Sequence, residues 1–360
     1  MLKLIHAADL HLDSPFAGLR PERAAQRRRE QRQLLERLAA LAAEKQADLV
    51  LLAGDLLDGS TVYQETAAAL AAALGAMPCP VLIAPGNHDY FGPDSIYAAV
   101  EWPGNVHIFT AERPEAVEFP ALHCTVYGRA FCAPHQEGSP LAGLRAEGEG
   151  LKLAVLHGEV EGGGDYGPIT RQEIAASGLD YLALGHIHQC SGLQREGATF
   201  WAYPGCPEGR GFDETGEKGA LYVELEPDVC RAELVPLCAR RYRVLSADIT
   251  GTDPAAAVRA AVPGEYREDI CRVLLTGERG EQPLDLAALE GELSGLCYGL
   301  TLRDRTRVSR DLWAKAEDDG LVGLFLQEMR ERISQNPEDG TLTQAVRFGM
   351  AALEGWEEIL

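Results

Sequence analysis

Short apolar runs, each followed by a turn with polar side chains, recur along the first half of the chain. The first run covers residues 2–5, and later ones begin at residues 49, 81, 153 and 181. Apolar runs of this kind that end in turn residues predict buried strands. The turns hold Asp, Asn or His, in the sequences Asp9-Leu10-His11, Gly54-Asp55, Gly86-Asn87-His88-Asp89, His157-Gly158 and Gly185-His186-Ile187-His188. On an extended chain, two residues that are two positions apart, such as Asp9 and His11, point to the same side.

Between the first three runs the apolar spacing becomes helical. Residues 20–45 and the alanine-rich residues 63–77 are predicted to form helices, and the second ends before Pro78. The apolar stripe of the first helix consists of Leu34, Leu35, Leu38 and Leu41. Alternation of strand and helix, with polar residues where strands end, predicts an α/β fold whose chemistry lies at the carboxyl edge of a sheet.

Strands predominate after residue 106. We expect them at residues 106–110, 123–130, 152–157, 181–185, 199–203, 220–226 and 230–237, with a helix at residues 169–177. Strands joined partly by helices and partly by hairpins suggest two sheets packed face to face with helices outside. Residues 1–240 are therefore predicted to form one large α/β domain.

The pattern changes twice more toward the end of the chain. Residues 241–310 alternate between short strands and helices, which predicts a small second α/β unit. Residues 311–360 predict two helices separated by Asn336-Pro337. Their apolar residues at helical spacing are Leu321, Leu324, Phe325, Met329 and Ile333 in the first and Leu342, Val346, Leu353 and Trp356 in the second. These faces either pack on the core of the same chain or bind a partner helix.

The composition narrows the class of protein. Although 46% of the 360 residues are hydrophobic, no stretch approaches the roughly 18 consecutive apolar residues that a membrane span needs. The first residues lack the pattern of a signal peptide, so we expect a cytoplasmic protein with no membrane partner. The nine cysteines are scattered without a CxxC pair, which favours reduced thiols over a thiolate zinc site.

The charge is strongly acidic but unevenly distributed. A formal net charge of −22 opposes non-specific binding to nucleic acid, which is itself a polyanion. Residues 18–37 depart from this average, with seven arginines against three glutamates. This basic run is either a solvated helix face, which we favour slightly, or a surface that contacts phosphate.

Seven oxygen and nitrogen donors follow the predicted strands: Asp9, His11, Asp55, Asn87, His157, His186 and His188. Seven donors are too many for one small divalent ion and suit two. The mixture of imidazole and carboxylate favours Mn²⁺, Fe²⁺ or Zn²⁺ over Mg²⁺. Two such ions form a clamp for displacement at phosphorus, and a carboxylate must bridge them. Asp55, which stands alone on its turn between two groups of ligands, is the expected bridge.

One imidazole is left over for proton transfer. His88 follows the ligand Asn87 and points the other way, so it is the candidate catalytic residue that donates a proton or hydrogen bond to the leaving or a non-bridging oxygen. A histidine in this role needs an orienting partner, and the candidate is Asp58, three residues beyond the bridge. The histidines outside the turns are expected to be ordinary core or surface residues: His6, His107, His123 and His135. The sequence predicts no substrate-binding residue.

In their order and spacing, these motifs resemble the five sequence blocks of the calcineurin-like metallophosphoesterases. The blocks are Asp9-x-His11, Gly54-Asp55-x-x-Asp58, Gly86-Asn87-His88-Asp89, His157-Gly158 and Gly185-His186-x-His188. Residues 6–15, Tyr203-Pro204-Gly205 and residues 214–219 are similar to the SbcD-type DNA repair exonucleases, in particular their YhaO-like branch. The resemblance implies a four-layer αββα sandwich over residues 1–240, a capping domain over residues 241–310 and C-terminal helices.

The resemblance also implies how the ligands divide. One metal would be held by Asp9, His11, Asp55 and His188, and the other by Asp55, Asn87, His157 and His186. It further implies Mn²⁺-dependent exonuclease or endonuclease activity on DNA ends in DNA repair, with a coiled-coil ATPase of the SbcC type as partner. A homodimer is a further assembly that stays open.

Two alternatives remain beside this interpretation. Many of these nucleases carry a second histidine where this chain has Asp58, and an Asp at this place resembles the phosphatases. Phosphoesterase action on nucleotides or other small phosphodiesters is therefore the first alternative. The second is a non-catalytic partner subunit that keeps the fold, against which the intact set of ligands argues.

Overall fold

The computed structural model describes residues 1–16, 19, 21–59, 62–280, 282–309, 313–336 and 338–355. The chain divides into two compact units. The first contains Met1–Leu245, Val262–Val273 and Glu292–Thr301, and the second contains Ser246–Ala261, Leu274–Gly291 and Leu302–Leu360. The division at residues 240 and 310 that the sequence suggests stays a prediction.

The first sheet runs in the order β14-β13-β1-β2-β3-β4. Its parallel strands are β1 (Leu2–Ala7), β2 (Leu49–Leu52), β3 (Val81–Ile83) and β4 (Val106–Ile108), and beside β1 lie the antiparallel strands β13 (Gly219–Glu226) and β14 (Val229–Pro236). The parallel strands are joined by α1 (Pro21–Glu44), α2 (Gln64–Gly75) and the short α3 (Ile96–Ala99). Proline suits the first position of α1, because the first N–H groups of a helix have no partner within it.

The second sheet runs in the order β11-β12-β10-β7-β6-β5. Its strands are β5 (Glu115–Phe119), β6 (Cys124–Gly128), β7 (Leu151–His157), β10 (Tyr181–Gly185), β11 (Gln194–Glu196) and β12 (Thr199–Ala202). The helix α4 (Arg171–Ala176) begins with a capping box, in which the side chains of Thr170 and Glu173 bond each other's backbone N–H groups. The edge strands β5 and β11 were not predicted, since their mixed polar sequences lack an apolar run.

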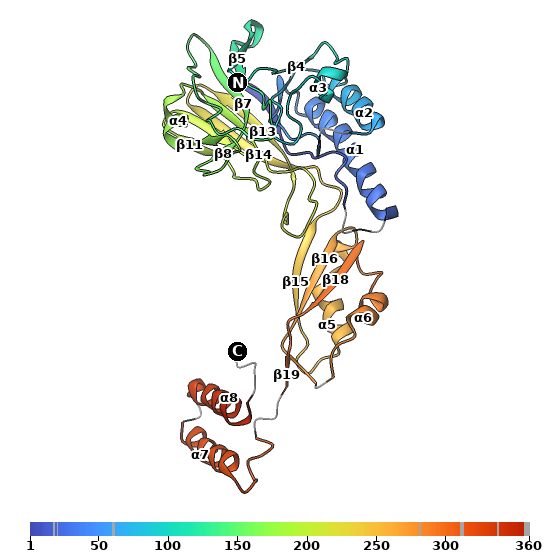
Figure 1. Ribbon diagram of the computed structural model, residues 1–360, viewed down its shortest axis with the longest axis vertical. Helices are drawn as coiled ribbons and strands as arrows, with labels where there is room; N and C mark the ends of the chain where they lie inside the picture. The colour runs from blue at the N-terminus through green and yellow to red at the C-terminus, as the bar shows by residue number, and fades with distance from the viewer. Residues whose placement is uncertain are drawn as a thin grey trace. The chain divides into compact units, whose positions relative to one another are not determined.

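The two sheets pack face to face between outer helices, which confirms the predicted αββα sandwich. Leu4 and Leu51 of the first sheet share one buried cluster with Leu153 and Tyr181 of the second. The other face of the first sheet packs on the leucines of α1 and α2, and Ile174 of α4 packs on the outer face of the second. Figure 1 shows α1 and α2 on one side of the sheets and α4 on the opposite side.

Two small pairs of strands and a third sheet complete the strands of the described chain. The pairs are β8 (Glu159–Val160) with β9 (Pro168–Ile169), and β17 (Glu278–Arg279) with β19 (Arg307–Val308). The third sheet has the order β15-β16-β18, formed by Tyr242–Asp248, Ile270–Thr276 and Gly299–Asp304. The helices α5 (Pro254–Ala261) and α6 (Leu286–Glu292) alternate with these strands, as the sequence predicts.

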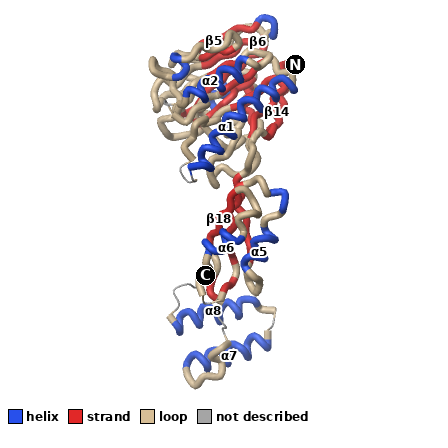
Figure 2. The backbone as a smooth tube through the Cα atoms, turned by 90° about the vertical axis from the view of Figure 1, so that its right-hand side faces the viewer, coloured by secondary structure: helices blue, strands red, loops and turns tan. Residues whose placement is uncertain are grey.

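The last two helices pack on each other. They are α7 (Leu321–Gln335) and α8 (Gly340–Glu354), drawn in blue beside each other in Figure 2. Leu326 and Met329 of α7 meet Val346 and Met350 of α8 in a small buried cluster. The expected break between them is confirmed at Asn336, whereas Pro337 and Trp356 lie outside the described residues.

Candidate metal centre

The polar turns of both sheets come together where the parallel strands end. Backbone hydrogen bonds join the first two turns, because the N–H of Asp9 donates to the carbonyl of Gly54 and that of His11 donates to Asp55, each at 3.0 Å. The strands β7 and β10 are parallel neighbours, so His157 lies beside the turn that carries His186. The structure thus gathers side chains from five segments of the sequence at one edge.

The expected extended geometry of Asp9 and His11 is wrong. β1 ends at Ala7, and the φ angles of Asp9 and His11 are 54° and 44°. Asp55 and His186 also have positive φ, at 51° and 107°. Side chains other than glycine seldom adopt this left-handed backbone, which concentrates at functional sites. The two donors therefore reach the same place through a strained turn and not through the alternation of a strand.

Gly54 allows these turns to approach closely. Its φ is +86°, and a Cβ there would lie 2.6 Å from Nδ1 of His157 and 2.8 Å from the backbone of Gly86. Both distances are shorter than carbon and nitrogen atoms tolerate, so a larger residue would push the turns apart. The Gly-Asp sequence thus brings Asp55 between the two sheets.

Asp9, His11 and His188 form the first cluster of possible ligands. The Nε2 atoms of His11 and His188 lie 3.1 Å apart, and Oδ1 of Asp9 lies 3.9 Å from Nε2 of His188. Asp9 and His11 are fully buried, whereas the His188 side chain is 29% exposed. Donor atoms of all three side chains lie within 4.8 Å of one another, which is the spacing of ligands around one ion.

Asp55, His157 and His186 form the second cluster, together with Asn87. Nε2 of His157 lies 3.4 Å from Oδ2 of Asp55 and 3.0 Å from Oδ1 of Asn87, and Nδ1 of His186 lies 3.3 Å from the same amide oxygen. Oδ2 of Asp55 is also 3.8 Å from Nε2 of His11 in the first cluster. This oxygen lies between the two clusters, which is the place of a bridging ligand.

Hydrogen bonds on the far side of three rings, those of His157, His11 and His188, fix the nitrogen that faces inward. His157 donates through Nδ1 to the carbonyl of Ala53 at 2.8 Å. In the first cluster, His11 donates to Asp58 at 3.0 Å and His188 donates to Glu214 at 2.7 Å, both through Nδ1. A ring with its proton on Nδ1 presents the lone pair of Nε2, as metal-binding histidines do.

The electrostatics of the clusters suit a cation. Burial lowers the pKa of His11 and of His186 to about 4, so both rings are neutral at pH 7. Burial raises the pKa of Asp9 to about 6. Although burial opposes ionisation of both groups in the pair, His157 holds the pKa of Asp55 well below its usual range, and Asp55 raises that of His157 to about 9. Cations compete with protons for such groups, so this donor set fits divalent ions.

His88 does not make the hydrogen bond expected from the sequence. Its Nδ1 lies 4.0 Å from Oδ1 of Asp58 and 3.5 Å from the Asp58 carbonyl oxygen. The carboxylate of Asp58 instead accepts hydrogen bonds from His11 and from Arg210. The His88 side chain is 44% exposed and its ring stands edge-on to that of His11, with centroids 4.8 Å apart. His88 thus lies at the rim of the centre, and the carboxylate of Asp58 contacts the ring of His11 instead.

Comparison with known proteins places this centre in a family. The profile of the calcineurin-like phosphoesterases matches residues 2–190, which is more than half of the chain and contains all seven predicted ligands. The chain belongs to the calcineurin-like phosphoesterase family. The match supports a hydrolase that binds divalent metal ions, in agreement with the two clusters.

Individual relatives among the phosphoesterases share between 23% and 34% sequence identity with this chain. The chain is 34% identical over 237 residues to the "uncharacterized metallophosphoesterase YhaO" of Bacillus subtilis, a match that covers 62% of this chain and only 57% of that protein. It is 25% identical over 415 residues to the DNA double-strand break repair protein Mre11 of Methanopyrus kandleri, covering 99% and 88%. It is 23% identical over 273 residues to the SbcD subunit of the nuclease SbcCD of Bacillus subtilis, covering 63% and 67%. These relatives support the SbcD-type, YhaO-like branch.

Four residues that lie around this centre have no role predicted from the sequence. Arg210 and Glu214 contact His188, and Lys218 donates to the His188 carbonyl at 2.7 Å. Glu214 and Lys218 lie in the stretch 214–219 that carries the resemblance, which is the only signal the sequence offered. The fourth, Asp89, is buried behind Asp55 and ends the motif Gly86-Asn87-His88-Asp89.

The remaining histidines are outside both clusters. His6 is buried, with its ring nitrogens 2.9 Å from the Tyr181 hydroxyl and 3.1 Å from the Leu184 carbonyl, so it is a core residue as expected. His135 is exposed, and its ring lies tilted beside that of Tyr166. Tyr166 in turn stacks on His186, with ring centroids 5.2 Å apart. In the described part of the chain no helix combines the length and hydropathy that a bilayer crossing requires.

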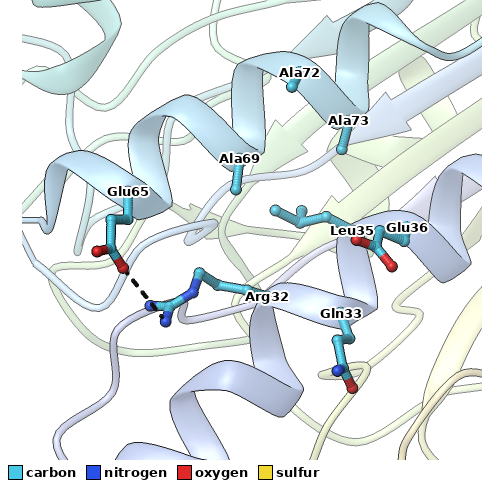
Figure 3. Close-up of a pocket in the computed structure, with 8 residues that line it drawn as sticks. All are labelled: Arg32, Gln33, Leu35, Glu36, Glu65, Ala69, Ala72 and Ala73. Atoms are coloured by element: carbon cyan, nitrogen blue, oxygen red, sulfur yellow. Dashed lines mark ion pairs between the residues drawn. The ribbon is translucent and has the colours of Figure 1, made fainter.

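The hollow shown in Figure 3 is not part of the metal centre. It has a volume of about 360 Å³ and lies between α1 and α2, where three alanines and Leu35 face the ion pair of Arg32 and Glu65. None of the predicted ligands lines it. A second hollow, of about 310 Å³, borders the centre directly and is lined by Ser14, Pro15, Phe16, Asp58, Arg210, Gly211, Asp213 and Glu214.

Proposed function

We propose that the chain is a two-metal phosphodiesterase that acts as a Mn²⁺-dependent nuclease on DNA ends. The observation that carries this proposal is the gathering of seven donors into two clusters with Oδ2 of Asp55 between them. The ions, when bound, would supply Lewis acidity and neutralise charge at the phosphoryl group. Asp9, His11 and His188 would hold one ion and Asn87, His157 and His186 the other, with Asp55 shared. Fe²⁺, Zn²⁺ and Mg²⁺ are the other candidate ions.

The proposed proton donor is His88. Its backbone N–H donates to Oδ1 of Asp55 at 2.9 Å, which ties its position to the bridging carboxylate. Its ring is outside both clusters and partly exposed, so a substrate can reach it. With Nδ1 directed toward the Asp58 carbonyl, Nε2 is the atom available to donate to the leaving oxygen of a phosphodiester.

DNA as substrate is supported by the relatives whose names describe DNA break repair or a nuclease subunit. The basic run on α1 gives little support, because five of its six described arginines contact other groups of the chain. Arg27 is fully buried against Glu30 and Glu208, and Arg32 pairs with Asp13 and Glu65. Gly18 and Arg20 of that run lie outside the described residues. The DNA contacts are therefore expected near the metal centre.

An ATPase of the SbcC type is the proposed partner, in keeping with the nuclease subunit among the relatives. The candidate docking surface is the exposed apolar face of α7 and α8. Leu321 and Leu324 are 70% and 65% exposed, and Phe348 of α8 is 46% exposed. Exposed large apolar residues on a helix pair suit the apolar stripe of a coiled coil. A homodimer is a second possible assembly, and the oligomeric state of the same purified chain would test it.

One observation favours the alternative of a small phosphodiester substrate. The hollow beside the centre is lined by three carboxylates, Asp58, Asp213 and Glu214, against the single cation of Arg210. Such a surface repels a long polyanion more than it repels a nucleotide with one or two charges. The alternative therefore predicts cleavage of small diesters without cleavage of DNA.

A direct assay separates these functions. The purified full-length chain with Mn²⁺ is incubated with end-labelled single-stranded DNA, with end-labelled double-stranded DNA, and with the chromogenic diester bis(p-nitrophenyl) phosphate. The nuclease proposal expects Mn²⁺-dependent shortening of DNA that Asp55→Asn abolishes. Cleavage of the diester alone would replace it with the small-substrate function. A chain that cleaves none of them with any of the four candidate ions would be the non-catalytic subunit.

A further inference from the structure

Arg210 joins two carboxylates that contact different histidines of the same cluster. One terminal nitrogen of its guanidinium, Nη1, donates to Oδ1 of Asp58 at 2.9 Å, and the other, Nη2, donates to Oε1 of Glu214 at 3.1 Å. These are the same oxygens that accept hydrogen bonds from Nδ1 of His11 and of His188. The five side chains form one continuous chain of contacts, from His11 through Asp58, Arg210 and Glu214 to His188.

The planar fork of arginine suits this place. Its two terminal nitrogens are held at a fixed separation, so they keep both carboxylates in position at once, whereas a lysine offers one point charge. The backbone N–H of Arg210 also donates to Oε2 of Glu214 at 2.7 Å, which fixes Glu214 through both of its oxygens. The result is a pair of rings whose Nε2 atoms face each other at 3.1 Å.

The positive charge of the guanidinium is already paired with carboxylates of this chain. Two carboxylates lie within 3.1 Å of it, and its side chain is only 22% exposed although it lines the hollow beside the centre. Contact with an anionic substrate would require at least one of these ion pairs to open. The contacts of Arg210 therefore favour a role through the histidines over a role as a phosphate-binding residue.

We propose that Arg210 is a positioning residue that sets the metal affinity of the Asp9–His11–His188 cluster. It acts by holding Asp58 and Glu214 against the two histidines, so that both rings present Nε2 to the same ion. The second cluster is oriented differently, since His157 donates to a backbone carbonyl and the amide of Asn87 supplies an oxygen. In the described residues no arginine contact reaches that cluster, so loss of Arg210 is expected to weaken one metal site and spare the other.

The inference rests on the proposed two-metal centre, and metal binding tests it without measuring activity. The full-length chain is stripped of metal and titrated with Mn²⁺ by isothermal calorimetry, and the electron paramagnetic resonance of bound Mn²⁺ is recorded. Wild type is expected to bind two ions with the signal of a coupled pair. Arg210→Gln is expected to bind one ion normally and the second about 10–100-fold more weakly, with the signal of isolated Mn²⁺ at low loading. Arg210→Lys should fall between the two.

Matched variants separate positioning from other effects. Arg241→Gln removes an arginine that pairs with the exposed Glu217 and should bind Mn²⁺ like wild type. Glu214→Gln should weaken the same single site as Arg210→Gln, and the double variant should be no weaker than the worse single one. The inference is overturned if the Arg210→Gln variant binds both ions at wild-type affinity, or if its affinity for both ions falls equally. Unchanged metal binding with a raised KM would make Arg210 a substrate contact. Wild type that binds no Mn²⁺ overturns the proposed function itself.

Discussion

The buried carboxylate of Asp89 accepts a hydrogen bond from the backbone N–H of Asp55 at 3.1 Å. Its other oxygen accepts from the N–H groups of Leu56 and Leu57, at 2.7 and 3.3 Å, and from the Tyr97 hydroxyl. The backbone N–H of Gly86 donates to the first oxygen, Oδ1, at 2.8 Å. One buried side chain thus satisfies the backbone of the turn that carries Asp55 and ties it to the turn that carries Asn87.

Asp89→Ala should therefore lower both stability and metal binding. It leaves several buried N–H groups without a partner, at about 1–3 kcal/mol for each one that water cannot reach. We expect the free energy of unfolding to fall by roughly 3–5 kcal/mol, measured by urea denaturation of the metal-free protein. Asp94→Ala, which removes an exposed carboxylate from the next loop, is the control and should change it by less than about 0.5 kcal/mol. Equal stability of the two variants would show that the turn does not depend on Asp89.

His88→Ala should separate chemistry from metal binding. The ring belongs to neither of the two clusters, although with His11 and Asp58 it forms a further group of possible ligands. If His88 is the proposed proton donor, both ions should stay bound in the variant, while turnover should fall by about 10²–10⁴-fold. Metal content by mass spectrometry and hydrolysis of bis(p-nitrophenyl) phosphate measure the two effects on one preparation. If the variant loses an ion, His88 is a ligand and its assignment as proton donor is wrong.

The sequence predicted which side chains gather at this edge of the sheets better than it predicted the contacts among them. Each predicted ligand follows an apolar run, and parallel strands bring their ends to one edge, so residues such as Asp9 and His157 could be found by position alone. Arg210 could not, because its partner Asp58 is 152 positions away and nothing in the local pattern joins them. The sequence suggests Asp58 as the partner of His88 because it lies three residues beyond Asp55, whereas the left-handed turn at His11 brings the His11 ring closer to it.

This corrected contact changes what Asp58→Asn is expected to do. An asparagine amide can still accept from His11, but it does not carry the charge that holds Arg210. The variant should therefore weaken metal binding at the Asp9–His11–His188 cluster and not only slow turnover. Calorimetric titration with Mn²⁺ checks this, with Asp13→Asn as control, since Asp13 lies two residues beyond His11 but contacts Tyr63 and Thr66 instead. Normal binding of two ions with reduced turnover would return Asp58 to its predicted role beside His88.

The proposed bridging role of Asp55 predicts an unequal loss of metal among variants of the candidate ligands. Asp55→Ala removes the oxygen that lies between both clusters and should abolish tight binding of both ions. Asn87→Ala removes an oxygen that contacts His157 and His186 of the second cluster, so one ion should remain. Anomalous scattering from crystals soaked in Mn²⁺ would show two peaks in the wild type, one in Asn87→Ala and none in Asp55→Ala. One fully occupied peak in the wild type would contradict a two-ion centre.

A buried ion-pair network predicts how stability depends on pH. Glu30 is bonded by Arg27 at 2.7 Å and by Arg240 at 2.9 Å. Burial would raise the pKa of Glu30, but the hydrogen bonds from Arg240 and Arg27 outweigh it and lower the pKa below 4.5. A carboxylate with a lowered pKa in the folded state contributes stability above its ordinary pKa and loses it as the pH falls through the folded value. The wild type should therefore lose more stability below about pH 4.5 than Glu30→Gln does. Urea denaturation across pH 3–6 measures this, with the exposed Glu36→Gln as control.

The helix pair α7–α8 should carry partner binding and not catalysis. Its own small core of Leu326, Met329, Val346 and Met350 is buried between the two helices, while Leu321 and Leu324 remain exposed on α7. Residues 313–336 and 338–355 also have a net negative charge, which makes them a poor contact for DNA. We expect Leu321→Glu with Leu324→Glu to abolish binding of a coiled-coil ATPase while Mn²⁺-dependent nuclease activity stays within about two-fold. Glu331→Gln, an exposed polar change on the same helix, should affect neither partner binding nor nuclease activity.

Deletion of residues 311–360 should reproduce the effect of the leucine variants in a soluble and active chain. A truncated chain that is insoluble or inactive would instead show that the helices support the fold, which is the alternative that the sequence left open.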